Sequence, residues 1–207
     1  MTWIKICGIT NTEDALRAAS LEIDALGFVF APSPRRVDPS TVQEIVQYLS
    51  PSVLRVGVFV NQDYSEVEKI LKDCGLSALQ FHGMESPDYC RTFLFPVIKA
   101  IRIRDVESLR EIDRYPNVSI LLDTYHPLKA GGTGSPFPWE IALEAKKKKD
   151  FILSGGLTPD NVGQAIRKVR PLGVDVSSGV ESMPGKKDLS KMVEFVEEVK
   201  KADEETR

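Results

Sequence analysis

The chain has 207 residues, of which 42% are hydrophobic, and a formal net charge of -3 at pH 7. This length can bury the core of one undivided domain, and the slight negative charge disfavours nucleic acid as a partner. Every apolar run is shorter than the roughly 18 residues of a membrane span, and the N-terminus lacks a secretion pattern. Three irregularly spaced cysteines predict no disulfide framework, and two histidines without a Cys-x-x-Cys pair predict no metal site. We therefore expect a cytoplasmic protein that does not associate with a membrane.

Short apolar runs alternate with amphipathic segments along the whole chain. We expect strands at Trp3–Cys7, Ala25–Phe30, Leu54–Val60, Ala78–Phe81, Val97–Ile103, Val118–Asp123, Phe151–Leu153 and Gly173–Val176. We expect helices at Thr12–Ser20, Pro39–Leu49, Ser65–Asp73, Pro87–Leu94, Val106–Tyr115, Trp139–Lys147, Pro159–Val169 and Leu189–Ala202. The strand candidates are almost continuously apolar, which is typical of strands covered on both faces.

Eight strand–helix units predict an α/β fold in which residues 1–207 form a single-domain (β/α)₈ barrel, or TIM barrel. The alternative is an open doubly wound sheet, which usually has only five or six strands. A barrel places function at the C-terminal ends of its strands and in the loops that follow them. The residues at these ends are therefore the candidates for chemistry.

A thiol and a carboxyl group end two of the expected strands. Cys7 precedes Gly8 at a strand–helix junction, which makes it a candidate acid, base or nucleophile. Asp123 ends a buried strand, where a carboxylate is costly unless it is paired or faces a site. The alternatives are packing for Cys7, and helix capping or a buried ion pair for Asp123. Cys74 and Cys90 lie on helical segments and are expected to be packing residues.

Glycine and serine residues follow the seventh and eighth expected strands. Gly155 and Gly156 follow one of them, and Ser177, Ser178 and Gly179 follow the other. Glycines let backbone N–H groups approach an anion, and barrels frequently bind phosphate between these two loops. The sequence therefore predicts a phosphate site, although tight turns alone would also explain the glycines.

Three further features lie after expected strands. Arg35 and Arg36 follow the second strand, and an arginine there can bind a carboxylate with two hydrogen bonds or remain solvated. His82 follows the fourth strand and either lines a pocket or caps the strand. The long segment 124–137 contains the run Gly-Gly-Thr-Gly, which is typical of a mobile cover over a site.

Short motifs recur in order over the whole chain. They are K-I-C-G-I-T at 5–10, G-F-V-F at 27–30 with Pro-Arg-Arg at 34–36, R-V-G-V-F-V at 55–60, Q-F-H-G at 80–83, L-L-D-T at 121–124, L-S-G-G-L-T-P-D-N-V at 153–162, D-V-S-S-G-V-E at 175–181 and P-G-K-K-D at 184–188. Together they resemble the phosphoribosylanthranilate isomerase family of tryptophan biosynthesis. No single motif is specific, but their joint occurrence is.

The resemblance implies a barrel that needs neither metal nor cofactor. It also implies the Amadori rearrangement of N-(5-phosphoribosyl)anthranilate to 1-(2-carboxyphenylamino)-1-deoxyribulose 5-phosphate. In this family the cysteine of K-I-C-G is the general base and the aspartate of L-L-D-T the general acid, positions held by Cys7 and Asp123. The arginine that contacts the anthranilate carboxylate falls on Arg36, with Arg35 as the alternative. We further expect Asp175 to accept a hydrogen bond from a ribose hydroxyl.

Other functions remain open from the sequence. A Schiff-base aldolase would use Lys5 or Lys99, and the related histidine-pathway isomerase would use two aspartates, which Cys7 disfavours. A sensor of phosphoribosyl ligands would keep the phosphate site without catalysis. The charge of Lys5 or of the arginines is expected to favour a thiolate at Cys7. The sequence is compatible with either a monomer or a homodimer.

Overall fold

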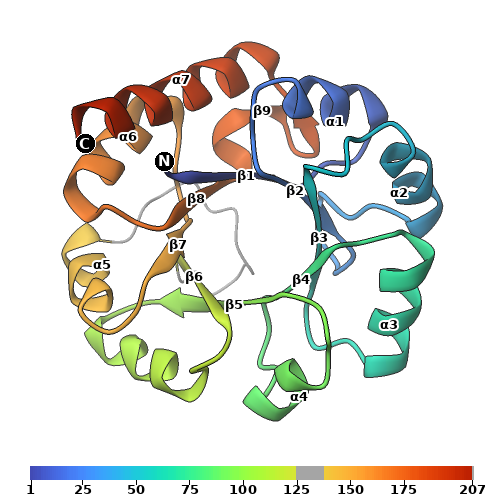
Figure 1. The fold of residues 1–207 in the computed structure, drawn as a ribbon, viewed down its shortest axis with the longest axis horizontal. Coiled ribbons are helices and arrows are strands. Elements are labelled where there is room, and N and C mark those ends of the chain that lie inside the picture. The colour runs from blue at the N-terminus through green and yellow to red at the C-terminus, as the bar shows by residue number, and fades with distance from the viewer. Residues whose placement is uncertain (125–137, 207) are drawn as a thin grey trace.

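The computed structural model describes residues 1–124 and 138–206 and shows eight parallel strands that close into a barrel (Figure 1). The barrel strands are β1 (Trp3–Cys7), β2 (Ala25–Val29), β3 (Leu54–Phe59), β4 (Ala78–Phe81), β5 (Val97–Ile103), β6 (Ser119–Thr124), β7 (Phe151–Leu153) and β8 (Gly173–Val176). Each strand pairs with the next, and β8 pairs with β1. The predicted (β/α)₈ barrel is confirmed, and the open doubly wound sheet is wrong.

Helices surround the barrel, as Figure 1 shows. They are α1 (Thr12–Ala19), α2 (Pro39–Val46), α3 (Tyr64–Asp73), α4 (Pro87–Arg91), the 3₁₀ helix η1 (Val106–Arg114), α5 (Trp139–Lys146), α6 (Pro159–Val169) and α7 (Leu189–Glu205). Side chains cap several of them: Asn11 Oδ1 accepts from the N–H of Asp14, and Ser86 Oγ accepts from that of Tyr89. Within the described ranges, no helix has the length and apolar character needed to cross a membrane.

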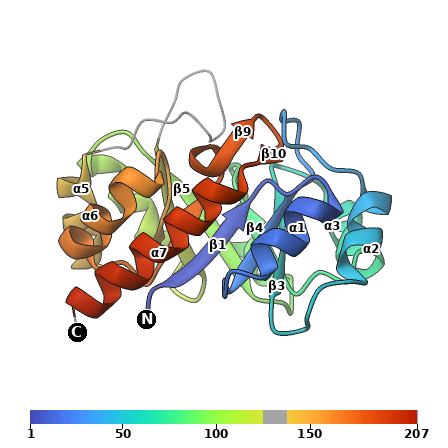
Figure 2. The same cartoon turned by 90° about the horizontal axis from the view of Figure 1, so that it is seen from above.

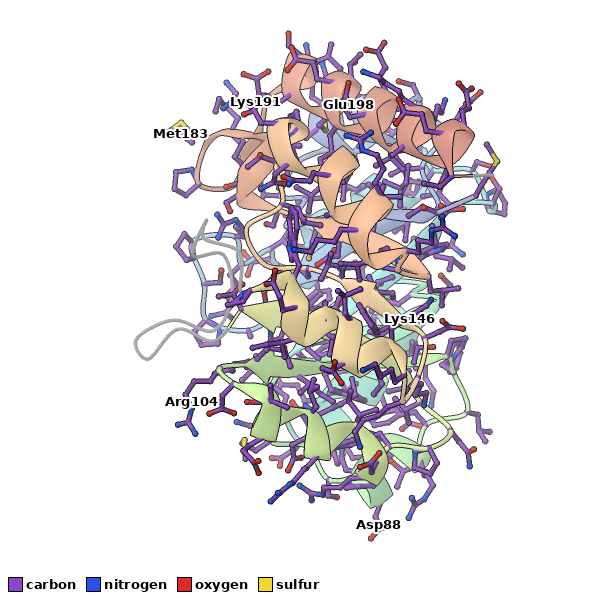
Figure 3. All side chains as sticks on the ribbon, turned by 90° about the vertical axis from the view of Figure 1, so that its left-hand side faces the viewer. Asp88, Arg104, Lys146, Met183, Lys191 and Glu198 are labelled. Carbon is purple, nitrogen blue, oxygen red and sulfur yellow. The ribbon has the colours of Figure 1, made fainter. Side chains whose placement is uncertain are left out.

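A short hairpin follows β8 and was not predicted from the sequence. It comprises the antiparallel strands β9 (Glu181–Met183) and β10 (Lys186–Lys187), and the 3₁₀ helix η2 (Ser178–Val180) precedes it. In Figure 2 this hairpin lies at one end of the barrel, and the two chain termini lie at the other. Figure 3 shows Met183 projecting from the hairpin, with α5, α6 and α7 side by side on the outer surface.

The hydrophobic core has two parts, because successive residues of a strand point to opposite faces. Ile4 and Ile6 of β1 belong to the outer part, between the strands and the helices. Trp3 of the same strand packs on the inner part, inside the barrel. The inner part consists of Ala25, Val56, Ala78, Ile98, Ala100, Leu121 and Ile152. The inward-facing residues near the end of each strand therefore lie at the C-terminal end of the barrel.

Candidate active site

A cavity opens at the C-terminal end of the barrel, where the fold places its chemistry. The space inside it, together with the open mouth, is about 770 Å³. Its polar and glycine lining residues are Cys7, Ser33, Arg35, Gln80, His82, Asp123, Ser154, Gly155, Gly156, Asp175, Ser177 and Ser178. All the site residues predicted from the sequence lie in this lining except Arg36 and Gly179.

Cys7 ends β1 and points into the cavity, although its side chain is nearly buried. It is buried but belongs to neither of the two clusters of hydrophobic core residues. Gly27 of β2 provides the space for its sulfur, because a Cβ atom at Gly27 would lie 2.6 Å from Sγ. Gly8 then turns the chain with a φ of +79°, a conformation that favours glycine.

The pKa of Cys7 is set by burial and by nearby charges. Burial raises the pKa of the thiol, the positive charges of Lys5 and Lys187 lower it, and the negative charge of Asp175 raises it. The net effect is a pKa above the ordinary value. Lys5 acts in the direction expected from the sequence, but it does not outweigh burial.

Lys5 forms a buried ion pair inside the barrel. Its Nζ lies 2.7 Å from Asp175 Oδ1, and the Lys5 side chain is fully buried. Asp175 Oδ2 accepts a second hydrogen bond, of 3.0 Å, from Ser154 Oγ. Burial lowers the pKa of Lys5, but the charges of Asp175 and Cys7 raise it to a net value above 10.5. Lys5 therefore stays positively charged beside the Cys7 thiol.

Asp123 is the last inward-facing residue of β6, and its carboxylate contacts the ring of His82. Its Oδ2 lies 3.0 Å from His82 Nε2, and its Oδ1 accepts a 2.9 Å hydrogen bond from the N–H of Thr124. On the other side of the ring, His82 Nδ1 lies 3.2 Å from Nε2 of Gln80. Asp123 is 3% exposed and lines the cavity, and no ion pair joins it to a Lys or Arg within the described residues.

The structure separates the two arginines that follow β2. Arg35 donates from Nε and Nη2 to the two carboxylate oxygens of Glu181, at 2.8 and 2.7 Å. Its guanidinium is therefore already occupied, although Arg35 lines the cavity. Arg36 is exposed, lies outside the lining, and forms no ion pair with a described residue. The ion pair with Glu181 thus distinguishes Arg35 from Arg36.

Lys187 ties the hairpin after β8 to the end of β1. Its fully buried Nζ donates to the carbonyl of Cys7 at 2.6 Å, to that of Ser177 at 3.1 Å and to Glu181 at 3.0 Å. Burial raises the pKa of Glu181, but hydrogen bonds from Arg35 and the charge of Lys187 lower it more, so that its net pKa lies below 4.5. These contacts fix three cavity-forming segments relative to one another.

The loops after β7 and β8 present unpaired backbone N–H groups. Gly155 and Gly156 have φ values of +84° and +73°, and a Cβ atom at Gly155 would lie 2.5 Å from the backbone N of Thr124. The N–H groups of Gly155, Gly156 and Ser178 donate to no described residue. Gly179 has a different role, because a Cβ atom there would lie 1.9 Å from the carbonyl oxygen of Leu157. It lets the two loops pack together.

Several other sequence expectations can be compared with the structure. Lys99 does not line the cavity and instead donates to the carbonyl of Gly83 at 2.7 Å. Lys5 is also outside the lining, which disfavours a Schiff-base site at either lysine. Cys74 and Cys90 are buried in the outer core, as predicted. The Gly-Gly-Thr-Gly run of the expected cover lies outside the described residues.

Sequence reasoning gave no role to several polar contributors to this site. Ser33, Gln80 and Ser154 line the cavity, and Lys187 hydrogen bonds to the Cys7 carbonyl. The alternation of the fourth strand could have identified Gln80, because it lies two residues before His82 on the same face. Ser154 likewise lies at an inward strand end. Nothing in the local pattern around Lys187 indicates that its side chain is buried.

Comparisons with known proteins identify the family of this chain. Residues 4–198 match the family model described as N-(5'-phosphoribosyl)anthranilate (PRA) isomerase. The N-(5'-phosphoribosyl)anthranilate isomerase of Trichlorobacter lovleyi is 50% identical over 204 residues, which is 98% of this chain and 100% of that protein. The crystal structure of phosphoribosyl anthranilate isomerase from Thermotoga maritima superposes with a TM-score of 0.92 at 41% identity, covering 97% of this chain and 100% of the other.

A third similar structure is a phosphoribosyl anthranilate isomerase in complex with reduced 1-(o-carboxyphenylamino)-1-deoxyribulose 5-phosphate. It has a TM-score of 0.88 at 40% identity and covers 97% of this chain and 100% of the other. Family match, relatives and structures agree over nearly the whole chain. The chain therefore belongs to the N-(5'-phosphoribosyl)anthranilate isomerase family.

Proposed function

We propose that this chain rearranges N-(5-phosphoribosyl)anthranilate to 1-(2-carboxyphenylamino)-1-deoxyribulose 5-phosphate with Cys7 as general base and Asp123 as general acid. The observation that carries the proposal is that a thiol from β1 and a carboxyl from β6 line one cavity. General acid–base chemistry needs two such groups on one substrate.

The reaction moves four protons in three stages. Asp123 protonates the furanose ring oxygen, the bond from that oxygen to C1′ breaks, and the anthranilate nitrogen becomes a protonated Schiff base. The Cys7 thiolate removes the proton from C2′, and the electron pair moves to the nitrogen to give an enolamine. The enolamine then tautomerises without a catalytic side chain, as water takes the enol proton and gives a proton to C1′, which yields the ketone. Cys7 returns its proton to water and Asp123 takes one up, so that protons balance over the cycle.

Two binding contacts, one at each end of the substrate, position the sugar between Cys7 and Asp123. The phosphate binds to the unpaired N–H groups of Gly155, Gly156 and Ser178, supported by Ser177 and by Gly179, which holds the loops together. At the other end, the free guanidinium of Arg36 binds the anthranilate carboxylate after the side chain turns toward the cavity.

Two further cavity residues contact the sugar. Asp175 accepts from a ribose hydroxyl with its remaining lone pairs, and His82 contacts the sugar beside Asp123. Correct orientation by all these groups contributes roughly 7–11 kcal/mol to lowering the barrier.

The test supplies the substrate to the purified chain from anthranilate and phosphoribosyl pyrophosphate through the preceding transferase. We expect the fluorescence of the substrate to decline with saturable kinetics and the ketose phosphate to accumulate. A chain that binds the product but leaves the fluorescence unchanged would contradict the proposal and favour a sensor. Covalent labelling by borohydride in the presence of a sugar phosphate would favour an aldolase.

Arg36→Ala and Arg35→Ala are a matched pair of variants that test which arginine binds the anthranilate carboxylate. Arg36→Ala is expected to raise KM while leaving the thermal midpoint unchanged, because its guanidinium has no ion pair to a described residue. Arg35→Ala is expected to lower the thermal midpoint, because it leaves the buried Glu181 carboxylate without its bidentate partner. A higher KM for Arg35→Ala and a lower thermal midpoint for Arg36→Ala would instead indicate that Arg35 binds the carboxylate.

A further inference from the structure

A buried lysine lies behind the cavity wall, against the chain segments that follow β1 and β8. Lys187 belongs to β10, and the carboxylate of Asp14 accepts from its backbone N–H at 2.8 Å, which anchors the main chain there. The Lys187 side chain is fully buried and does not line the cavity. Any influence of Lys187 on a ligand must therefore pass through the groups that it contacts.

The amine of Lys187 has three oxygen acceptors. Nζ donates to the carbonyl of Cys7 at 2.6 Å, to that of Ser177 at 3.1 Å and to Glu181 Oε1 at 3.0 Å. An ammonium group has three N–H donors, so the protonated form satisfies all three oxygens. Burial lowers the pKa of Lys187 to below 10.5, and the charge of Glu181 opposes this. Each oxygen can thus be held by its own N–H.

The peptide bond between Cys7 and Gly8 is held on both sides. Its carbonyl accepts from Lys187, and the N–H of Gly8 donates to the carbonyl of Gly27 at 2.9 Å. Cys7 also pairs with Gly27 in the β1–β2 ladder. The position of Cys7 therefore does not depend on Lys187 alone.

The peptide bond between Ser177 and Ser178 is held at its carbonyl end only. This carbonyl accepts from Lys187 and, at 3.4 Å, from the N–H of Val180. The N–H of Ser178 donates to no described residue, and Ser178 lines the cavity. The C=O and N–H groups of a trans peptide point in opposite directions, and no described peptide is cis. With its carbonyl on Lys187, this peptide turns its N–H toward the cavity.

Packing fixes where this segment lies but not which way its peptide points. A Cβ atom at Gly8 would lie 3.0 Å from Ser177 Oγ, and one at Gly179 would lie 1.9 Å from the carbonyl oxygen of Leu157. Neither contact involves the carbonyl of Ser177 or the N–H of Ser178. Of the two hydrogen bonds to that carbonyl, the one from Lys187 is shorter and comes from a charged donor. It is the contact that sets the direction of the peptide.

We propose that Lys187 is a positioning residue for the substrate phosphate, because its hold on the Ser177 carbonyl turns the Ser178 N–H toward that phosphate. The positive charge also polarises the peptide, which makes the N–H at its other end a stronger donor. The inference rests on the proposed binding of phosphate by the loops after β7 and β8.

The first test is a titration of the wild-type protein with inorganic phosphate, followed by NMR of the backbone amides. We expect the amide proton of Ser178 to shift downfield together with those of Gly155 and Gly156, because each donates to the anion. A response of the two glycines without Ser178 would overturn the inference. The absence of any response would overturn both the inference and the phosphate site. This readout does not involve turnover, so it can fail while the isomerase assay succeeds.

The second test is Lys187→Met, which keeps the length of the side chain and removes its donors. Arg35 still pairs with Glu181, so no carboxylate is left without a partner. We expect the dissociation constant for inorganic phosphate to rise about tenfold, because a hydrogen bond to a charged group is lost. KM for the isomerisation should rise more than kcat falls, since Cys7 keeps its contacts with β2.

The glycine amides provide a control within the same variant. Lys187 has no hydrogen bond to their loop, so at saturating phosphate Gly155 and Gly156 should keep their shifts while Ser178 loses its own. Equal losses at all three amides would overturn the inference, because they would reflect a general loosening of the fold. An unchanged phosphate affinity in folded Lys187→Met would also overturn it.

Lys186→Met is the matched control, because it removes the same charge from the exposed neighbouring residue. This variant should leave the phosphate affinity, KM and the Ser178 shift unchanged, and a tenfold weaker affinity here would overturn the inference. Lys187→Gln serves as the second variant if Lys187→Met does not fold. Its amide keeps two N–H donors but ends one atom short of Nζ, so the same selective loss at Ser178 is expected. A wild-type Ser178 response in folded Lys187→Gln would overturn the inference.

Discussion

At the scale of single residues, the positions of the two candidate catalytic side chains could be predicted from the sequence, but their contacts could not. The positions of Cys7 and Asp123 in the cavity were predictable, because both end strands on the inward face. Their partners were not, since hydrogen bonds join residues far apart in the chain. The Lys5–Asp175 pair spans 170 positions, and the bond from Lys187 to the Cys7 carbonyl spans 180. Local patterns contain no information on such contacts.

Lys5 has a predictable effect on the pH dependence of the reaction. Burial raises the pKa of Cys7, and the charge of Lys5 opposes this. Lys5→Met is therefore expected to raise the pKa of Cys7 further and to move the acidic limb of kcat/KM to higher pH. Asp175→Asn removes a negative charge that raises the pKa of Cys7, so it should move the same limb to lower pH.

The measurement is kcat/KM against pH for the wild type and both variants. Thermal unfolding serves as the control, because breaking a buried ion pair costs about 3–5 kcal/mol. Shifts of the two variants in the same direction would show that lost stability, rather than charge at Cys7, controls the limb.

At the scale of elements, the expected strands match the observed ones to within one residue at either end. Their apolar character and flanking turns were sufficient for this. The segment Val106–Tyr115 was expected to be helical and forms the 3₁₀ helix η1, a type that an amphipathic pattern does not distinguish well from an α-helix. The β9–β10 hairpin was missed because strands of three and two residues are too short to show an alternation.

The junction of the two phosphate loops is an element-scale test. In Gly179→Ala, the added Cβ would lie 1.9 Å from the Leu157 carbonyl oxygen, so the loops must separate. We expect a loss of about 1–3 kcal/mol in unfolding free energy and a higher KM, because the N–H groups no longer converge. Gly163→Ala in α6 is the control, where the nearest atoms are flexible side-chain ends of Glu198 and Arg167.

Urea unfolding and substrate titration measure the two effects of Gly179→Ala. An unchanged KM in a destabilised Gly179→Ala variant would show that the packing of these loops does not position the phosphate.

At the scale of the whole molecule, the barrel is closed by contacts between the two ends of the chain. β8 pairs with β1, and α7 packs against both α6 and α1. The carboxylate of Asp203 in α7 accepts from the N–H and the hydroxyl of Thr2, both at 2.6 Å. Both chain termini lie at the end of the barrel opposite the hairpin (Figure 2). Neither Thr2 nor Asp203 lines the cavity, so this contact is separated from the candidate active site.

This separation predicts that Asp203→Ala destabilises the protein without affecting turnover. Two partly buried hydrogen bonds to a carboxylate are lost, which should lower the unfolding free energy by about 1–2 kcal/mol. Glu204→Ala removes an exposed neighbouring carboxylate and should have little effect on either quantity. Urea unfolding and kcat at a temperature where both variants are folded measure the outcome. A fall in kcat for folded Asp203→Ala would contradict the separation.

The central claim is that Cys7 and Asp123 act as base and acid across one cavity, and its most direct test is kcat of Cys7→Ala and Asp123→Asn. Cys90→Ala is the control, because it removes a buried thiol of the outer core far from the lining. The account predicts that both site variants fold and that each loses at least about 10²-fold in kcat, while Cys90→Ala retains wild-type turnover. A folded Cys7→Ala or Asp123→Asn variant with near wild-type kcat would contradict it.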